Sequence, residues 1–336
     1  MNKFLLFLIL FVLISCNSNL ESKIFNHFQK FIKKFQKNYS SISEFMGRYY
    51  IFKNNYLETM SSETSSYTKG INEFSDLTYQ EFKKHYLNLN YDAMAVANLN
   101  PYHLKISNDA PASIDFRTLN RVTTVKNQGA CGAAWAFSTV GNLEGLYSGH
   151  YGELVELSKS VIIDCDTKDS GCNGGLMEYA FTWLKSNGIM TEADYPYHGY
   201  KDECKIDIDK CIPMRITGFE KLGGGSSVFS CTDEEEMKEF LYSRGPVSVA
   251  FNADPLQTYA SGIIDKTANQ CPTSGINHCA LLVGYGTDSA SGLDYWIVKN
   301  SWGAAWGESG YFRIRRGNGT CGINCYVISA TVEFDD

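Results

Sequence analysis

The stretch 128–138 has the features of a nucleophile at a helix N-terminus, except for the nucleophile itself. A thiol at the first turn of a helix has a lowered pKa, because the helix dipole stabilises the thiolate. At that place Ala134 carries only a methyl group. Gly129 and Gly132 permit a close backbone approach, and Gln128, six residues upstream, is placed to donate its amide to an oxyanion. The helix is indicated by apolar residues at helical spacing: Ala136, Val140, Leu143 and Tyr147.

Two further stretches complete a family resemblance. Residues 276–286 read Ile-Asn-His-Cys-Ala-Leu-Leu-Val-Gly-Tyr-Gly, and residues 295–303 read Tyr-Trp-Ile-Val-Lys-Asn-Ser-Trp-Gly. With 128–138 they resemble the papain family of cysteine peptidases. The resemblance implies that His278 is the general base and that Asn300 orients its ring. By the same resemblance Trp302 shields that hydrogen bond and Gln128 forms the oxyanion hole.

The chain departs from the family pattern at the nucleophile. That pattern reads Gln-Gly-x-Cys-Gly-Ser-Cys-Trp-Ala-Phe-Ser, whereas this chain has Ala133 for the common serine and Ala134 for the catalytic cysteine. A methyl group cannot form a thioester. In a hydrolase whose catalytic residues work as a unit, this loss costs roughly a millionfold in turnover.

Three nearby side chains are candidates to replace the missing nucleophile. The family resemblance pairs Cys131 with Cys172 in a disulfide. Cys279 follows His278 on an expected strand, where successive side chains point to opposite faces, so we expect it to face away from the site. Ser138 lies one turn deeper in the helix, where we expect it to be packed.

The cysteines favour disulfides over a metal site. The chain has 11 cysteines, and setting aside Cys16 in the leader leaves ten, an even number. Zinc is the alternative, but the tight pairs lack a second Cys-x-x-Cys or a histidine at finger spacing, and we expect no metal and no cofactor. The resemblance also pairs Cys165 with Cys204 and Cys271 with Cys321. We expect the remaining pairs to be Cys211 with Cys231 and Cys279 with Cys325.

The substrate contacts follow from the resemblance as well. It implies that Gly174 and Gly175 bind an extended peptide through their backbone, as an edge strand would. The main specificity pocket would be lined by Leu176, Met177, Ala280 and Tyr326. With Tyr326 at the floor of this pocket, we expect a shallow subsite that admits modest aliphatic side chains.

The N-terminal third reads as a leader followed by a helical unit. Residues 1–18 have the charged start and short apolar core of a secretory signal, with a bacterial lipid anchor at Cys16 as the alternative. Apolar stripes predict helices over 20–35 and from Ser43 onward, and Glu44 is spaced to pair with Arg48. Residues 70–76 alternate like a short strand, and Thr78 with Glu81 predicts a capping box.

This unit resembles the propeptide of papain-family zymogens. The matching residues are Glu44, Arg48, Phe52 and Asn55, followed by Gly70, Asn72, Phe74 and Asp76. We therefore expect an inhibitory propeptide over 19–110, with its linker at 88–112 running through the active cleft and a processing site at about 109–111. A peptidase domain over 111–336 would follow.

The expected fold is α+β: a helical propeptide domain followed by two papain-like lobes, a helical left lobe and a β-barrel-like right lobe. Five short apolar runs bounded by Gly, Asn or Pro predict strands. They are 246–252, 279–285, 295–299, 311–315 and 326–332.

Composition and charge narrow the class of protein. The formal charge of -7 argues against a nucleic-acid binder, and the leader is too short to be an integral membrane span. We expect passage through the secretory pathway to a lysosome or the extracellular space. The partners implied are peptide or protein substrates, the chain's own propeptide and protein protease inhibitors.

Two functions fit this sequence. The first is a cathepsin L-like cysteine endopeptidase zymogen that is inactive as written because of Ala134. The second is a natural pseudopeptidase that binds peptides or protease inhibitors without cutting them.

Overall fold

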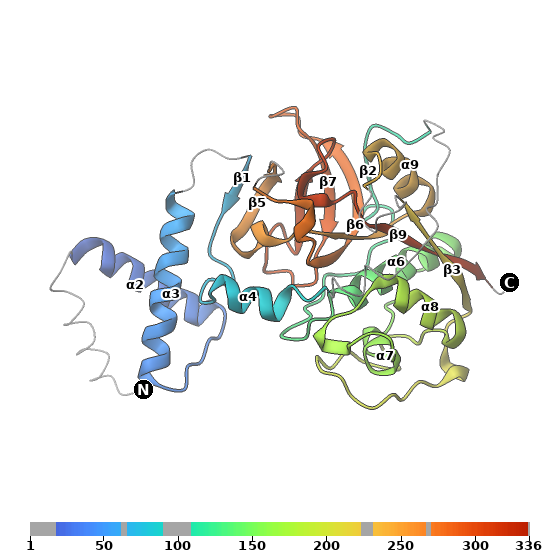
Figure 1. Cartoon of the computed structure of the whole chain (residues 1–336), viewed down its shortest axis with the longest axis horizontal. Helices are drawn as coiled ribbons and strands as arrows, with labels where there is room; N and C mark the ends of the chain where they lie inside the picture. The colour runs from blue at the N-terminus through green and yellow to red at the C-terminus, as the bar shows by residue number, and fades with distance from the viewer. Residues whose placement is uncertain (1–17, 62–65, 90–108, 223–230, 267–269, 335–336) are drawn as a thin grey trace.

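The computed structural model describes residues 18–61, 66–89, 109–222, 231–266 and 270–334 (Figure 1). Residues 1–17 of the expected signal peptide and most of the expected linker lie outside these ranges. Along the chain come an N-terminal helical unit, a helical lobe and a lobe built on a β-sheet. The α+β prediction is confirmed.

The N-terminal unit is held together by aromatic side chains. Helix α2 (Ser18–Lys34) packs against α3 (Ile42–Ser61), and the apolar faces of the two predicted helices meet between them. Ile42, at the start of α3, is exposed. The buried side chains of this small core are Ile24, Phe25, Phe28, Phe31, Phe45, Tyr49 and Phe52.

The predicted pairing of Glu44 with Arg48 is wrong. Glu44 accepts hydrogen bonds from the backbone and side chain of Ser40. Arg48 reaches out of its own helix to Glu81, at 2.9 Å, and to the Asp76 carbonyl, at 3.0 Å. A carboxylate brought close by the tertiary fold is the stronger partner, since exposed pairs along a helix contribute only about 0.2–0.5 kcal/mol.

Helix α4 (Tyr79–Tyr86) begins with the predicted capping box. Thr78 Oγ1 accepts from the Glu81 amide, and the Glu81 carboxylate accepts from the Thr78 amide. The same carboxylate that caps α4 also binds Arg48, so this cap links α4 to α3.

The strand predicted at 70–76 is wrong, because this segment forms turns. The Asn72 side chain accepts from the Phe74 amide and donates to the Gln257 carbonyl, which bends the backbone and fixes it to the right lobe. A strand does form just upstream, where β1 (Tyr67–Lys69) pairs with β5 (Tyr259–Ile264). The N-terminal unit therefore adds a strand to the sheet of the right lobe.

The left lobe consists of three helices around a common core. They are α6 (Ala134–Tyr151), α7 (Lys159–Cys165) and α8 (Met177–Asn187). Helix α6 is buried along most of its length and contacts both α7 and α8 and the sheet strands β4, β6 and β9. It is therefore the element shared by the two lobes.

The right lobe is a sheet with strand order β1-β5-β8-β7-β6-β4-β9-β3, with β2 added against β6. The five predicted strands are confirmed as β4 (Val247–Phe251), β6 (His278–Thr287), β7 (Asp294–Lys299), β8 (Tyr311–Arg315) and β9 (Val327–Phe334). Sequence reasoning missed β2 (Ile114–Asp115), β3 (Met214–Leu222) and β5. Glycines interrupt the last two strands: β3 has its bulge next to Gly218, and Gly262 in β5 has a positive φ.

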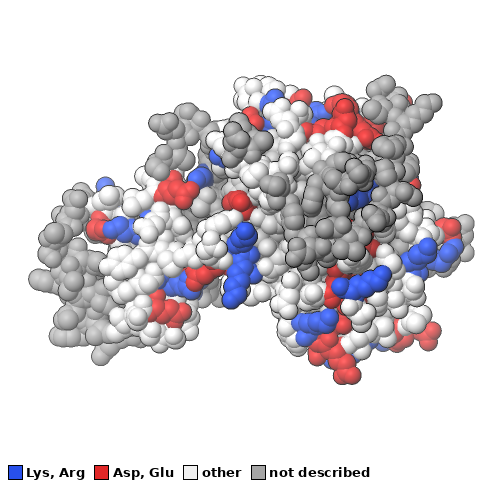
Figure 2. Space-filling model, viewed as in Figure 1, with Lys and Arg blue, Asp and Glu red and all other residues white. Residues whose placement is uncertain are grey.

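The remaining elements are helix α9 (Glu234–Arg244) and short 3₁₀ turns. The 3₁₀ turns cover Gly171–Asn173, Ile208–Lys210, Asp254–Thr258, Thr273–Gly275 and Thr320–Gly322. Within the described ranges, no helix is long and apolar enough to cross a membrane. On the face drawn in Figure 2, basic and acidic side chains are interspersed.

Candidate active site

Ala134 lies where a helix dipole points at the cleft between the lobes. It is the first residue of α6, and its N-cap Ala133 makes no side-chain capping bond. The approach to the helix is fixed by the Cys131–Cys172 disulfide and by the Gly132 amide, which donates to the Cys172 carbonyl at 2.8 Å. Ala134 is 7% exposed. The backbone thus holds position 134 where a nucleophilic side chain would be useful, but alanine has no nucleophilic atom.

His278 and Asn300 form a buried hydrogen-bonded pair beside this helix start. His278 Nε2 lies 2.9 Å from Asn300 Oδ1. The Ser301 amide donates to the same Oδ1 atom at 2.8 Å, which identifies it as the acceptor and Nε2 as the donor. His278 Nδ1, the ring nitrogen left for proton transfer, makes no hydrogen bond of normal geometry with any described residue.

Burial sets the protonation state of His278. It lowers the pKa of the imidazole to about 4, against the opposing effects of Asn300 and of the Tyr86 backbone in the N-terminal unit. With the N-terminal unit in place, the ring is therefore neutral at any pH above about 4, and Nδ1 is a base.

Trp302 covers the histidine. Its indole lies 4.7 Å from the imidazole, centroid to centroid, and is 1% exposed. Three aromatic side chains of the N-terminal unit pack edge-on against the same indole: Phe74, Phe82 and Tyr86.

Gln128 is held rigidly by its neighbours. Its Nε2 donates to the Cys131 carbonyl at 2.9 Å, and its Oε1 accepts from the Ser301 hydroxyl at 2.6 Å. These bonds fix the orientation of the amide and use only one of its two N–H donors. Sequence reasoning did not single out Ser301, although it lies inside the Asn-Ser-Trp-Gly motif.

The N-terminal unit occupies the cleft. The Leu89 amide donates to the Asn277 carbonyl at 3.2 Å, next to His278. Asn88 lies so close to two glycines that a Cβ at Gly174 would be 2.0 Å from the Asn88 carbonyl and one at Gly132 would be 2.3 Å from its side chain. The glycines at these positions therefore allow a peptide to lie directly on the backbone of the left lobe.

The residues expected in the specificity pocket lie in two places. Leu176, Met177 and Tyr326 are fully buried in one apolar cluster, against which Leu89 packs. Gly175, which we expected to bind a peptide through its backbone, lines the small cavity that Leu89, Ala134 and His278 share. Ala280 belongs to the apolar cluster on the other side of its strand.

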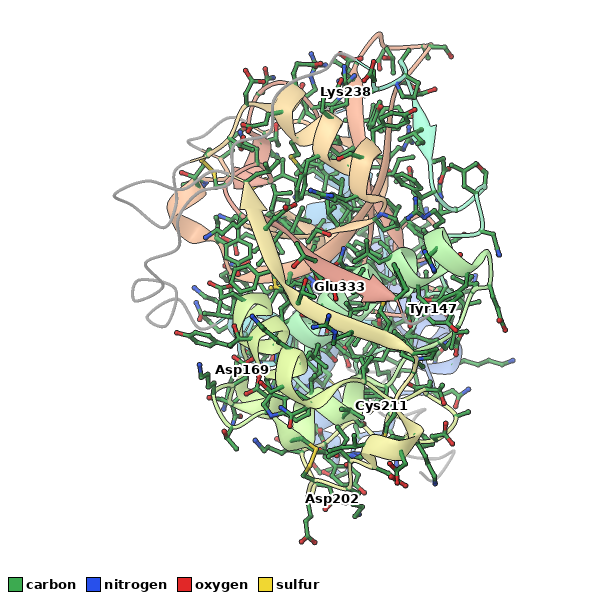
Figure 3. The ribbon with its side chains drawn as sticks, turned by 90° about the vertical axis from the view of Figure 1, so that its right-hand side faces the viewer. Tyr147, Asp169, Asp202, Cys211, Lys238 and Glu333 are labelled. Atoms are coloured by element: carbon green, nitrogen blue, oxygen red, sulfur yellow. A yellow bond between two sulfur atoms is a disulfide. The ribbon has the colours of Figure 1, made fainter. Side chains whose placement is uncertain are left out.

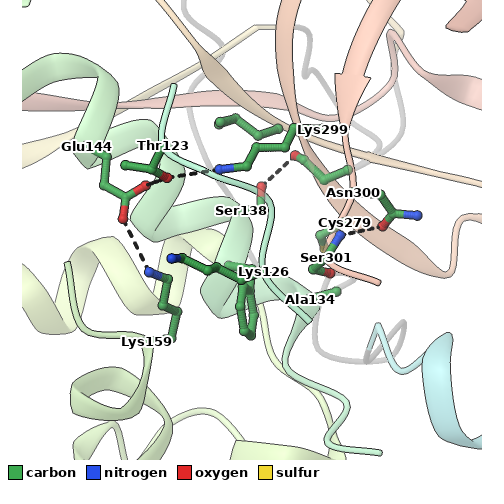
Figure 4. Close-up of a pocket in the computed structure, with 13 residues that line it drawn as sticks. Thr123, Lys126, Ala134, Ser138, Glu144, Lys159, Cys279, Lys299, Asn300 and Ser301 are labelled. Carbon is green, nitrogen blue, oxygen red and sulfur yellow. Dashed lines mark hydrogen bonds and ion pairs between the residues drawn. The ribbon is translucent and has the colours of Figure 1, made fainter. Parts of the chain in front are cut away.

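Cys279 does not face away from the site as expected. It lines the small cavity with His278 and Gly175, and a second one with Ala134 (Figure 4). The two neighbours do pack on different sides, since Cys279 lies in the cluster of Ala134 whereas His278 contacts Phe251 and Trp302 of the other cluster. Ala134 lines the same cavity as both of them. Burial raises the pKa of the Cys279 thiol well above its usual value, which keeps it protonated. Ser138 is packed as expected and donates to the Ala280 carbonyl.

Four disulfides are present in the described residues. Cys131–Cys172, Cys165–Cys204 and Cys271–Cys321 are those that the resemblance implied. The other two expected pairs are wrong, because Cys231 pairs with Cys325. Two hydrogen bonds between Thr232 and Asn324 hold the flanking segments side by side. Cys279 and Cys211 are free thiols; Figure 3 marks Cys211 near the bottom of the left lobe.

A buried charged network that sequence reasoning missed lies behind Ala134 (Figure 4). Lys299 donates to Thr123, Thr123 donates to Glu144 on α6, and Glu144 accepts from Lys159 on α7. Burial lowers the pKa of Lys299 to about 8, against the effect of Glu144. The network links β7, next to Asn300, to the left lobe. Among the described residues, no group of three or more His, Cys, Asp or Glu is arranged to hold a metal ion.

The comparison with known families agrees with this geometry. Residues 110–331 match the model of the papain family cysteine proteases. The chain belongs to the papain family. In this papain-family chain, residues 28–82 also match the cathepsin propeptide inhibitor domain. The helical unit that occupies the cleft is thus a propeptide of the kind found in family zymogens.

Relatives of this papain-family chain are similar over nearly its whole length. A viral cathepsin of Choristoneura fumiferana nuclear polyhedrosis virus is 37% identical over 333 residues, which cover 96% of this chain and 97% of the relative. Cathepsin F of Drosophila melanogaster is 38% identical over 92% of this chain and 51% of the relative. The structure of digestive procathepsin L 3 from Tenebrio molitor larval midgut has a TM-score of 0.80 and 35% identity, covering 92% of this chain and 99% of that one.

Proposed function

We propose that this chain is the zymogen of a papain-type cysteine endopeptidase, with Ala134 at the position of the nucleophile, and that it does not cut peptides as written. The observation that carries the proposal is the intact His278–Asn300 pair, at 2.9 Å, next to a methyl group at the start of α6. A protein that only reused the fold would not need a neutral buried base beside a helix N-terminus.

The roles follow from the geometry once position 134 carries a thiol. His278 Nδ1 takes the thiol proton, and the thiolate, stabilised by the helix dipole, attacks the carbonyl carbon of the substrate. The free N–H of Gln128 then lies ready for the oxyanion. His278 returns its proton to the leaving amine, and water hydrolyses the thioester. Asn300 and Trp302 hold the ring in place throughout.

Peptide substrates would take the place of Asn88 and Leu89. These residues lie on Gly174 and bind the Asn277 carbonyl, so the cleft accepts an extended chain. Leu176, Met177 and Tyr326 with Cys279 form the adjacent apolar wall. Ala280 would contribute less to this pocket than its neighbour Cys279.

We further propose the boundaries 1–18 for a signal peptide, 19–110 for the propeptide and 111–336 for the peptidase domain. The four disulfides support passage through an oxidising compartment. A lysosomal or extracellular destination fits both these disulfides and the family.

The decisive experiment restores the nucleophile. The Ala134→Cys variant, activated at acid pH, should cleave a fluorogenic peptide. The matched controls are Ala134→Ser, which adds a single oxygen of weak nucleophilicity, and Ala134→Cys combined with His278→Ala. Both controls should be inactive. A folded and processed Ala134→Cys variant without activity would contradict the proposal.

A second candidate function is a pseudopeptidase that binds peptides or protein protease inhibitors. It is supported by the cleft, which already holds Asn88 and Leu89 next to Ala134, a residue without a nucleophile. Its test is titration of the unaltered chain, after removal of the propeptide by an added protease, with a protein inhibitor of papain-type peptidases. A dissociation constant of about 1 μM or below supports this function, and no binding contradicts it.

A further inference from the structure

The loop between α7 and α8 includes Gly174 and Gly175, which we expect to bind a peptide. The carboxyl group of Asp169 packs directly against this backbone: a Cβ added at Gly175 would be 2.7 Å from Asp169 Cγ and 2.7 Å from the indole of Trp135. Asp169 Oδ1 also accepts a hydrogen bond from the Leu176 amide at 2.9 Å. The Asp169 side chain, marked in Figure 3, therefore holds the backbone on which a peptide would lie.

A second buried carboxyl group, that of Asp166, lies beside Asp169. Asp166 is 0% exposed and Asp169 is 7% exposed. Asp166 Oδ1 accepts from the Lys168 amide at 2.8 Å, and the two aspartate side chains are within hydrogen-bonding reach of each other. The Oδ2 atom of each is buried and has no other partner among the described residues. Two ionised carboxylates in one buried place would repel each other, whereas one shared proton joins them by a hydrogen bond.

We propose that Asp169 is a positioning residue for the substrate: as a neutral acid that donates its proton to Asp166, it fixes the backbone of residues 174–176 in the shape that a peptide binds. The carbonyl oxygen of the acid accepts from the Leu176 amide, and its hydroxyl donates to Asp166, which keeps one negative charge. The inference rests on the proposed peptidase function, since it takes this backbone as the peptide-binding surface. Asp169 acts through that backbone.

The surroundings favour the neutral form of Asp169. Burial raises the pKa of its carboxyl group well above the ordinary range, and the charges of Asp166 and of Glu178 on α8 act in the same direction, against the Leu176 amide. The other ionisable side chains near this loop are Lys168, which lies over the Tyr179 ring, Lys201 beside Gly171, Lys221, which acts on Glu178, and the Cys279 thiol.

Asparagine substitutions test for the shared proton. In Asp169→Asn, the amide oxygen can accept from Leu176 and the amide NH₂ can donate to Asp166, so the variant imitates the neutral acid. In Asp166→Asn, the new NH₂ donates to an ionised Asp169 instead. Each single substitution therefore keeps the hydrogen bonds without the proton. The double substitution sets two NH₂ groups against each other, and Asp169→Ala removes the acceptor for the Leu176 amide.

The experiment uses the full unaltered chain and the Ala134→Cys enzyme. Each carries in turn Asp169→Asn, Asp166→Asn, the double substitution, Asp169→Ala and the control Asp209→Ala, on an exposed side chain. In the unaltered chain, hydrogen exchange of the Leu89 amide reports how firmly the cleft holds its segment, and urea unfolding reports stability. In the enzyme, KM and kcat are measured with a fluorogenic peptide.

Loss of the fixed backbone should weaken what lies on it. Asp169→Ala and the double substitution should speed exchange at Leu89 about tenfold and raise KM by a similar factor, which is the effect of about one lost hydrogen bond, with kcat nearly unchanged. The single asparagine substitutions and Asp209→Ala should leave exchange and KM close to those of the parent.

The pH dependence of unfolding gives a third readout. The folded chain keeps a proton on Asp169 that an unfolded aspartate loses at about pH 3.9, so the contribution of Asp169 to stability falls as the pH rises from that value through its raised pKa. Asp169→Asn should therefore stabilise the chain more at pH 7.5 than at pH 5.

Two results would overturn the inference: a double substitution as harmless as the single ones, or Asp169→Asn as damaging as Asp169→Ala. An inactive Ala134→Cys parent would instead contradict the proposed function, and hydrogen exchange and unfolding of the unaltered chain would still decide the role of Asp169.

Discussion

The indole of Trp302 lies 4.7 Å from the imidazole of His278, centroid to centroid. The same indole receives Phe74 of the propeptide at 5.1 Å. One side chain therefore both covers the histidine that we propose as the general base and contacts the N-terminal unit. Because these contacts share Trp302, we expect that loosening the N-terminal unit changes the surroundings of His278.

We predict that Phe74→Ala weakens the zymogen. Phe74 is completely buried between the propeptide and Trp302, so its truncation should cost about 3–5 kcal/mol. Urea unfolding should show this loss for the full chain, together with easier removal of the propeptide. Tyr50→Ala, on an exposed aromatic side chain of α3, is the control and should change little. Equal effects of the two substitutions would contradict the anchoring role.

Asn300 should affect the rate more than substrate binding. In the Ala134→Cys background, Asn300→Ala removes the acceptor for His278 Nε2–H and frees the ring to turn. We expect kcat to fall on the order of 100-fold, with KM nearly unchanged. Asn300→Asp, which keeps an acceptor at the same place, should retain more activity than Asn300→Ala. A change confined to KM would argue against a role in orienting the base.

The zymogen should lose stability as the pH rises through about 7, partly because of Glu73. Burial raises the pKa of this carboxyl group to about 7, against the opposing effects of Lys37 and Asn127. The folded chain keeps this proton, whereas an unfolded glutamate loses it at about pH 4.3, so the contribution of Glu73 to stability falls as the pH rises between these values.

Glu73→Gln should remove this dependence. The variant should have a higher Tm than the unaltered chain at pH 7.5 and nearly the same Tm at pH 5. Glu203→Gln, on an exposed side chain, is the control and should show no such difference between the two pH values. A gain for Glu73→Gln that is as large at pH 5 as at pH 7.5 would show that the carboxyl group does not titrate in this range.

The free thiols should differ in reactivity. Burial raises the pKa of both thiols, but Cys211 is only half-buried, whereas Cys279 is 1% exposed. A small maleimide should therefore label Cys211 in the native chain and Cys279 only after denaturation, as followed by peptide mapping. Cys231 and Cys325 should react only after reduction. Labelling of either of these two without reductant would contradict the observed pairing.

The sequence alone determined the parts of this protein whose chemistry is local. Three features follow from residues within a few positions of one another: the helix start at Ala134, the capping box of Thr78 and Glu81, and the five apolar strands. They are indicated by hydrophobic periodicity, capping residues and turn residues. The family motifs also indicated His278 and Asn300, because a motif is recognised from the types and order of its residues alone.

Only the tertiary structure decided which distant groups meet. Arg48 binds Glu81 rather than Glu44, Cys231 pairs with Cys325, and Cys279 lines the site, because each choice depends on how separate segments pack. The contact of Ala110 with Glu239 spans 129 residues, and nothing in either local sequence signals it. Local sequence patterns specify helices, strands and turns. Which side chains meet across the core depends instead on the free energy of the whole folded chain.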